Sequence, residues 1–277
     1  MNYTNQELQQ LHNVLYDILG EIIRVCDLLN IPYFIIGGTA IGAFYWKSII
    51  PWDDDIDIGM TRKNYERFLR EAPSILEKGF FLQWFETDYH TPHYFAKVMR
   101  EGTIFIEKDF KDLDVHRGIY IDIFPFDKVP DNKTLQAVHR IFCNFWNCCF
   151  MAKEVWMWKH ICKCDIEEPT NRSFFPCLAT WGVTKALSKR SIYRILSWCQ
   201  GYFNNGKHKY YNMVLMPRDH ISVQSINTPQ RMSLGPHNVW APSDIETYLR
   251  SHYNNLRKHL PKDEQINHRP IFLSFKL

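Results

Sequence analysis

The stretch that decides the fold is Pro51-Trp52-Asp53-Asp54-Asp55-Ile56-Asp57-Ile58-Gly59-Met60. Its second half alternates acidic and apolar residues, which is the pattern of a strand with one buried face. Because side chains at i and i+2 of a strand point the same way, Asp55 and Asp57 project together while Ile56 and Ile58 face the other side. Carboxylates in apolar surroundings are costly unless they are paired or bound to a cation. Two hard oxygen ligands on one face suit Mg²⁺, which keeps waters and takes phosphate oxygens from a substrate.

The residues before this stretch predict a helix, a short strand and a glycine turn. Apolar residues recur every three or four positions from Gln6 to Leu29, which predicts an amphipathic helix. Thr4 and Glu7 form a capping box at its start. The apolar run 33–36 predicts a buried strand, and a short helix is expected over 40–46. The glycine turn between them, Gly37-Gly38 followed by Thr39, lets backbone N–H groups approach a phosphate closely.

A third carboxylate lies in a second apolar run, residues 118–126, where Asp122 is the only acid. If this run is a strand beside the first, Asp122 converges with Asp55 and Asp57. Such a set can hold two metals, or one metal plus a general base. Two non-functional interpretations remain. The acidic stretch around Asp53 could be a solvated loop, and Asp122 could be an acid at a strand end whose hydrogen bonds are made by neighbouring groups. A calcium loop of the EF-hand type is excluded because its twelfth position would be Asn64 instead of Glu.

The rest of the chain predicts an α+β protein in two portions. A helix is expected after Thr61, running to about Ala72. Further strands are expected at 80–85, 94–100, 103–107 and 119–124. The ranges 131–165 and 178–204 look helical, 210–242 looks irregular with short strands, and a last helix is expected from Ser243 to about Tyr253. We therefore predict a catalytic core over 1–130 and a mostly helical portion over 131–277, packed on that core.

Seven of the eight cysteines lie in the helical portion, six of them between 143 and 177, and the eighth is Cys26. No export signal precedes them, which favours reduced thiols in a helical core over disulfides. A zinc site normally uses C-x₂₋₄-C pairs, whereas Cys162-Lys163-Cys164 has one intervening residue. Zinc is therefore the less favoured reading of these residues.

The charge balance excludes a nucleic-acid-binding protein of the usual basic type. The chain has 33 Lys or Arg and 30 Asp or Glu, a net charge of +3, so no strong field attracts nucleic acid. The most apolar stretch, 33–46, is shorter than the roughly 18–20 residues that span a bilayer. We expect a cytoplasmic protein. With its many aromatics, the helical portion could also dock on the inner face of the membrane, or it could be plain core.

The motifs resemble those of the LicD family, which includes the fukutin-related transferases. The resemblance rests on residues 37–43, on 50–60, on 95–103 and on 119–127. A weaker similarity lies in Val239-Trp240-Ala241-Pro242, Tyr248-Leu249, Tyr253 and Asn267-His268. The family usually has Tyr-Gly-Asp after its last helix, whereas Tyr253 is followed here by Asn254-Asn255. The part of the site that would bind the acceptor substrate can therefore differ from that of the family. Residues 131–230 contain nothing diagnostic of the family.

The resemblance implies a nucleotidyltransferase-like fold, with a mixed sheet and flanking helices. It also implies transfer of a substituted phosphate, typically phosphocholine, from CDP-choline or another CDP-alcohol. The acceptor would be a hydroxyl of a cell-surface glycan, a lipid-linked glycan or a lipopolysaccharide. By position, Asp55 and Asp57 match the metal-binding pair and Asp122 the third carboxylate, with Mg²⁺ as the metal and Mn²⁺ as an alternative. Gly38 and Thr39 match the turn that faces the donor phosphates.

Two cations complete the predicted site, and two other functions remain open. Lys97 could neutralise a phosphate, with a solvated strand lysine as the equal alternative; Arg62 is a weaker candidate of the same kind. A nucleotidyltransferase that moves NMP from an NTP to a hydroxyl would use the same aspartates and glycine turn. A non-catalytic nucleotide-binding module is the third reading, and the three retained carboxylates argue against it.

Overall fold

The computed structural model describes residues 3–154, 174–216, 218–253, 256–265 and 267–276. Its helices are α1 (Asn5–Leu29), α2 (Gly37–Tyr45), α3 (Arg62–Glu71), α4 (Lys133–Met151), α6 (Phe174–Ala186), α7 (Lys189–Gly201), α8 (Val223–Asn227) and α9 (Ile245–His252). Its strands are β1 (Phe34–Ile35), β2 (Asp57–Thr61), β3 (Phe80–Gln83), β4 (Ala96–Arg100), β5 (Ile104–Ile106), β6 (Ile119–Val129), β7 (Tyr210–Asn212), β8 (His220–Ser222), β9 (Gln230–Leu234), β10 (His237–Ala241) and β11 (Phe272–Ser274).

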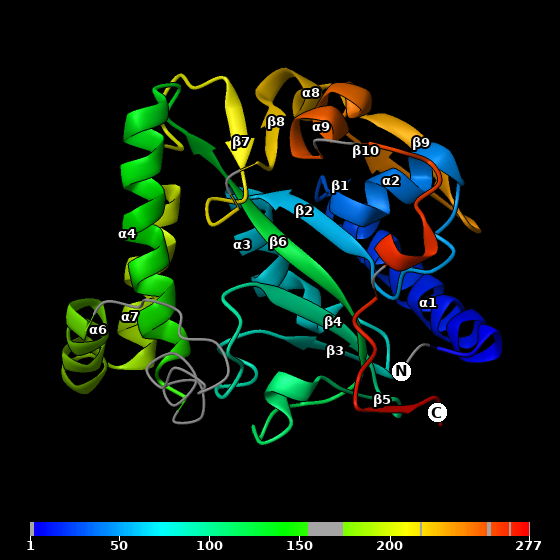
Figure 1. Ribbon diagram of the computed structural model, residues 1–277, viewed down its shortest axis with the longest axis horizontal. Coiled ribbons are helices and arrows are strands. Elements are labelled where there is room, and N and C mark those ends of the chain that lie inside the picture. Colours follow the sequence, from blue (N-terminus) through cyan, green and yellow to red (C-terminus); the bar gives the residue numbers. More distant parts are fainter. Residues whose placement is uncertain (1–2, 155–173, 217, 254–255, 266, 277) are drawn as a thin grey trace.

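A mixed sheet forms the centre of the molecule (Figure 1). Its main path runs β1-β2-β6-β4-β3, and the long strand β6 continues beyond β2 and β4 to pair with β7, which pairs with β8. β2 and β6 are parallel, whereas the other pairs are antiparallel. The hairpin β9–β10 and the pair β5–β11 lie outside this sheet. The predicted α+β class with a mixed sheet is confirmed.

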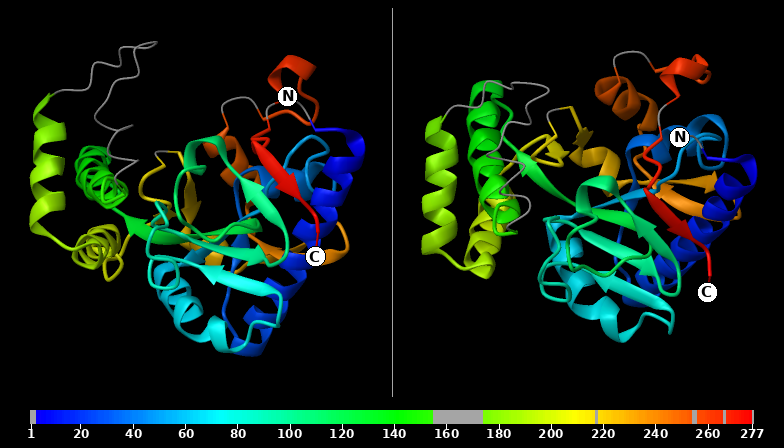
Figure 2. Two further views of the ribbon diagram at one scale, coloured as in Figure 1. Left: turned by 90° about the horizontal axis from the view of Figure 1, so that it is seen from below. Right: turned by 60° about the horizontal axis from the view of Figure 1, so that its bottom comes forward.

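The helix α1 forms because its start is capped and one of its faces is apolar. Thr4 Oγ1 accepts from Glu7 N, and the Glu7 side chain accepts from Thr4 N, which is the predicted capping box. The buried face packs across β4 and β6. Figure 2 shows α1 along one side of the sheet, where it covers the apolar face of the central strands.

The two faces of the central strands differ as the alternation predicts. Ile56, Ile58 and Ile123 are buried in the main core, on the side that α1 covers. Asp57 and Asp122 are only partly covered on the opposite face. The sheet therefore carries its carboxylates on a face distinct from the one that α1 packs against.

The helices α4, α6 and α7 form a separate layer at the end of the molecule away from α1 (Figure 1). α4 packs on both α6 and α7. Phe85, Tyr94 and Phe150 join these helices to the sheet in a second apolar cluster. Lys189 is fully buried there and its Nζ pairs with Glu154, so an ion pair also fixes this layer.

The prediction of a mostly helical second portion is wrong. Strands β7 to β11 all follow residue 131, and β7 extends the central sheet through β6. The short apolar segments between the prolines at 217 and 242 alternate too briefly to reveal which strand they would pair with. The division at residue 130 stays a prediction.

The predicted helices of this portion form with shifted ends. α4 covers 133–151 of the expected 131–165, and the remainder of that range lies partly outside the described residues. Cys26, Cys143, Cys148, Cys149 and Cys199 are free thiols. Cys162 and Cys164, where zinc was weighed, lie outside the part of the chain that the structure describes.

Candidate functional site

The predicted carboxylates meet where β2 and β6 run side by side. Asp57 and Asp122 are directly opposite each other in the parallel register of the two strands. Neighbouring strands lie about 4.8 Å apart, so the two side chains project from adjacent backbone positions. Asp55 lies two residues before Asp57, just ahead of β2, and lines a small pocket together with Asp122. The sequence prediction that Asp122 joins the acidic stretch is therefore confirmed by the strand register.

The acidic cluster, defined as Asp53, Asp55, Asp57 and Asp122, is electrostatically strained. Burial raises the pKa of Asp55 to about 6, with the nearby Asp54 carboxylate adding to the rise. Burial and the neighbouring carboxylates of Asp55 and Asp122 hold the pKa of Asp57 well above its ordinary value. Burial raises the pKa of Asp53 to about 8 and that of Asp122 to about 7. Each group is costly to ionise because it is buried, and nearby carboxylates add to that cost.

Lys97 is the cation of the cluster, and it is held firmly. It stands opposite Asp122 on β4, and its Nζ lies 3.3 Å from Asp122 Oδ1 and 3.8 Å from a Glu107 oxygen. The same ammonium group lies 3.3 Å from the centroid of the Tyr120 ring. With 3% of its surface exposed, Lys97 is not the solvated lysine that was weighed as an alternative. Its contact with a substrate phosphate stays a prediction.

Asp54 differs from the neighbouring aspartates because its side chain accepts hydrogen bonds from distant segments of the chain. Its Oδ2 accepts from the Tyr3 hydroxyl at 2.8 Å, and both of its oxygens accept from the backbone N of His268 at 3.0 and 3.1 Å. One carboxylate thus ties an N-terminal and a C-terminal segment to the acidic stretch. Ligand atoms of Asp54, Asp55 and His268 lie within 4.8 Å of one another. We regard Asp54 as structural, because both of its oxygens already accept hydrogen bonds.

The glycine turn is the start of α2, which begins three residues earlier than predicted. Gly37 has φ +55°, a conformation that favours glycine, and a β-carbon at Gly38 would lie 2.8 Å from Asp53 Oδ2. The Thr39 hydroxyl accepts from the backbone N of Asp57 at 2.8 Å, so it joins the turn to β2. The turn therefore lies against the acidic cluster. Contact of these residues with a donor phosphate stays a prediction.

A buried support behind the turn was missed by sequence reasoning. The backbone N of Gly37 donates to Tyr248 Oη at 3.0 Å, and this hydroxyl donates to Asp219 Oδ1 at 2.7 Å. His252 Nδ1 lies 3.1 Å from the same Asp219 oxygen. The only sequence signal was the family-like Tyr248-Leu249 and Tyr253. Asp219 carried no signal, because it reaches the turn through a residue 211 positions from Gly37 along the chain.

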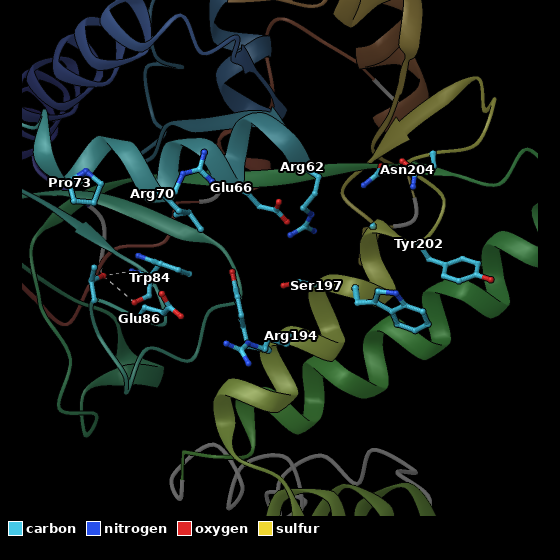
Figure 3. A pocket seen from close by; sticks show the side chains of 16 residues that line it. Arg62, Glu66, Arg70, Pro73, Trp84, Glu86, Arg194, Ser197, Tyr202 and Asn204 are labelled. Carbon is cyan, nitrogen blue, oxygen red and sulfur yellow. Dashed lines mark hydrogen bonds between the residues drawn. The ribbon is translucent and has the colours of Figure 1, made fainter.

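Arg62 lies apart from the acidic cluster. It follows β2 at the end opposite Asp57, and its guanidinium pairs with Asp127 and donates to Gln200 Oε1 at 2.8 Å. Figure 3 shows it in the wall of a cavity of about 1090 Å³ between α3 and α7, which has none of the predicted carboxylates in its lining. The predicted phosphate contact of Arg62 is at odds with this position, because five residues of strand, about 16 Å, separate it from Asp57. We leave Arg62 out of the candidate site.

A small pocket of about 140 Å³ opens onto the cluster. Its lining includes Asp55, Asp122, Glu107, Tyr120 and His268. Asp122 Oδ1 is buried without a hydrogen bond among the described contacts, although Lys97 is near. No hydrogen bond to the side chains of Asp55 or Asp57 occurs within the described residues. Oxygen ligands without donors, beside a pocket, fit a hard divalent cation such as Mg²⁺.

None of the helices in the described ranges combines the length and the apolar character needed to cross a bilayer.

Comparisons with known proteins show a family and several relatives that part of this chain resembles. Residues 30–161 match the family model described as LicD/FKTN/FKRP, nucleotidyltransferase domain. The lipopolysaccharide cholinephosphotransferase LicD of Haemophilus influenzae is 44% identical over 62 residues, which are 22% of this chain and 23% of that protein. An uncharacterised protein of Rickettsia typhi is 31% identical over 119 residues, 43% of this chain and 36% of that protein. One of Rickettsia prowazekii is 25% identical over 118 residues, 43% of this chain and 41% of that protein. The chain thus matches less than half the length of each of these relatives.

Proposed function

Since this chain belongs to the LicD/FKTN/FKRP nucleotidyltransferase-domain family through residues 30–161, we propose that it is a magnesium-dependent phosphocholine transferase. In this proposal it moves phosphocholine, or another substituted phosphate, from a CDP-activated alcohol to a hydroxyl of a lipopolysaccharide or cell-surface glycan. The choice of phosphocholine follows the name of the Haemophilus influenzae relative, which aligns over 62 residues. The matched segment carries the acidic stretch, β4 and β6.

One observation carries the proposal. Asp57 lies opposite Asp122 in the register of β2 and β6, Asp55 and Asp122 both line the small pocket, and Lys97 Nζ lies beside Asp122. When bound, Mg²⁺ would neutralise charge on the donor diphosphate and on the departing CMP. Asp55 and Asp57 would hold it, because they are the least engaged of the carboxylates.

The chain's own groups would complete the chemistry. The N-terminal turn of α2 lies beside the cluster, where Gly38 is close to Asp53, and a helix start favours anions. Lys97 keeps a positive charge beside Asp122 and would offset part of the phosphate charge. Asp122, with a pKa raised by burial to about 7, is placed either to complete the ligand set or to take the acceptor's proton near neutral pH.

The direct test measures CMP release and acceptor modification. Purified protein is incubated with Mg²⁺, CDP-choline and lipopolysaccharide, and the same assay is run with ATP or CTP as donor. We expect CMP and a phosphocholine-modified acceptor from CDP-choline alone. Asp57→Asn should lower the rate at least about a hundredfold, because a ligand of the metal is lost. Asp27→Asn, a change at an exposed aspartate of α1, is the matched control and should leave the rate unchanged.

The assay also separates the competing functions. Pyrophosphate release from ATP or CTP, with NMP transferred to the acceptor, would replace the proposal with a nucleotidyltransferase. Near-normal turnover in Asp57→Asn would reject the metal role. For Asp122→Asn, a higher Mg²⁺ requirement identifies a ligand, whereas a lost pH dependence near 7 with an unchanged Mg²⁺ requirement identifies the proton acceptor.

A further inference from the structure

The cavity of about 1090 Å³ between α3 and α7, which we call the α3–α7 cavity, plays no part in the proposed transfer (Figure 3). Its size is that of a ligand site, since small-molecule sites have volumes of about 300–1,000 Å³. Its walls come from α3, α7, the residues that follow α7 and the segment 84–87 after β3. None of the four aspartates of the acidic cluster is in its lining. The cavity is therefore a candidate for a second binding site.

Aromatic rings with exposed surface are the first feature of the α3–α7 cavity. Trp198 and Tyr202 lie one helical turn apart, with ring centroids 5.3 Å from each other, and Trp84 and Tyr193 add two more rings to the lining. Trp198 is 64% exposed and Tyr202 is 60% exposed, so their rings are accessible to a ligand. Among the described residues that line the cavity, Leu69 is the only Leu, Ile, Val or Met, and it is 5% exposed. The lining thus offers flat aromatic surfaces and almost no aliphatic ones.

The charged side chains of the lining balance one another. Three of them have ion-pair partners within 3.8 Å. The pairs are Arg62 with Asp127, Arg70 with Glu71, and Glu86 with Arg190. Glu66 and Arg194 remain, one of each sign, and neither has an ion pair within the described residues. The cavity therefore has no excess charge that would select an anion or a cation.

The polar groups of the α3–α7 cavity both donate and accept hydrogen bonds. Ser197 and Asn205 each have a donor and an acceptor, while Glu66 adds acceptors and Arg194 adds donors. A hydroxyl group also donates and accepts, so a molecule with many hydroxyls matches this mixed set. In a sugar ring the hydroxyls lie around the edge, and the C–H groups of the ring face pack on the negative face of an aromatic ring.

We propose that the α3–α7 cavity binds a neutral oligosaccharide. Trp198 and Tyr202 would carry the sugar rings, and the mixed polar groups would bind their hydroxyls. Phosphocholine is the poorer occupant, because it would fill only a small part of about 1090 Å³. A peptide helix is also the poorer occupant, because it would need aliphatic or aromatic anchors to enter an apolar groove, whereas this lining is polar between its rings. The proposal goes beyond the proposed transfer, since sugar binding here needs neither metal nor donor.

The experiment measures sugar binding in EDTA and without donor. The full chain is applied to an array of neutral hexose and N-acetylhexosamine oligosaccharides that also carries peptides and phosphocholine. Calorimetry then gives the affinity for the oligosaccharide that binds best. Trp198→Ala and Tyr202→Ala should each weaken this binding about tenfold, because one stacking surface is lost. Trp181→Ala is the matched control and should leave the affinity unchanged, since Trp181 is 47% exposed on α6 and lies outside the cavity lining. High salt should change the affinity less than about twofold, because the ligand is uncharged.

Four results would overturn the sugar site. They are no binding to any oligosaccharide of the array, wild-type affinity in Trp198→Ala and Tyr202→Ala, a strong dependence on salt, or binding of peptides or phosphocholine in place of the oligosaccharides. In EDTA, Asp57→Asn should bind the oligosaccharide as the wild type does. Because transfer depends on the acidic cluster and sugar binding in EDTA does not, a failure of the sugar site and a failure of the transferase proposal are distinguishable.

Discussion

The substitution Gly38→Ala tests whether the glycine turn lies close to the bound donor. Gly38→Ala should raise the KM for the donor about tenfold, because the new β-carbon would lie 2.8 Å from Asp53 Oδ2 and displace that carboxylate within the site. The free energy of unfolding should change by less than about 1 kcal/mol, since alanine is the better helix former and only a side-chain tip must move. Steady-state kinetics and urea denaturation measure the two effects.

The control for Gly38→Ala is Gly182→Ala on α6, where a β-carbon would meet no atom within 4 Å. It should leave the KM unchanged. An unaltered KM in Gly38→Ala as well would show that the turn does not approach the donor.

Lys97 provides the second residue-scale prediction. Lys97→Met should destabilise the metal-free protein by about 2–4 kcal/mol, because Asp122 and Glu107 lose the buried cation between them. The loss should shrink at saturating Mg²⁺, which supplies positive charge to the same cluster. Urea denaturation in EDTA and in Mg²⁺ measures both values. Lys108→Met, at an exposed lysine, is the control, and an equal stability of both variants in EDTA would contradict the role of Lys97.

Residues whose chemistry is local could be predicted from the sequence. The apolar run around Asp122 predicted a strand beside the acidic stretch, and β6 indeed places Asp122 opposite Asp57. The burial of Lys97 depends on the strand order β6-β4, which no local pattern encodes. The support of Gly37 comes from Tyr248, 211 positions later in the chain, with Asp219 behind it, so it required the fold.

Between elements, the buried pair of Arg62 and Asp127 joins α3 to β6, and Gln200 adds α7. Arg62→Met should destabilise the fold by about 3–5 kcal/mol, because it leaves the Asp127 charge buried without its partner. CMP release per folded molecule should stay within about twofold of the wild type, since Arg62 lies away from the acidic cluster. Urea denaturation and kinetics at low temperature measure the two effects.

Arg70→Met on the same helix is the matched control for Arg62→Met. The Arg70 side chain is exposed and, among the described residues, forms an ion pair with its neighbour Glu71, so its loss should change stability little. If correctly folded Arg62→Met bound the donor more weakly than the wild type, the phosphate contact predicted for Arg62 would be supported after all.

Elements with long periodic patterns were predicted well, and short ones were not. α1 was confirmed with its capping box, and α3 was confirmed after Thr61, although Thr61 makes no side-chain cap bond. The strands after residue 131 have only three to five residues each. Segments this short acquire their conformation from a partner strand, as β7 does from β6 and β11 from β5.

For the whole molecule, the raised pKa values of the acidic cluster predict how stability depends on pH. Without metal, the folded state keeps protons on Asp53, Asp55, Asp57 and Asp122 that the unfolded chain releases near the ordinary value of 3.8. Since the unfolded state then binds fewer protons, stability falls as the pH rises from about 4 to about 8. Thermal unfolding in EDTA at several pH values should show this decline.

Magnesium should counteract the decline, because its binding site needs ionised carboxylates. The rise in Tm on adding Mg²⁺ should therefore be larger at pH 8 than at pH 5.5. Asp57→Asn should flatten the decline in EDTA and reduce the response to Mg²⁺. A Tm in EDTA that does not fall between these pH values would contradict the electrostatic picture of the cluster.

The hydrogen bonds of Asp54 have a consequence for biosynthesis. A ribosome releases the acidic stretch early, yet the backbone amide that clasps Asp54 belongs to a residue 214 positions later. Until His268 has been synthesised, the nascent chain contains the mutually repelling aspartates without the hydrogen bonds from His268 to Asp54. These hydrogen bonds therefore form late in synthesis, and a ribosome that stalls before residue 268 yields a chain that lacks them.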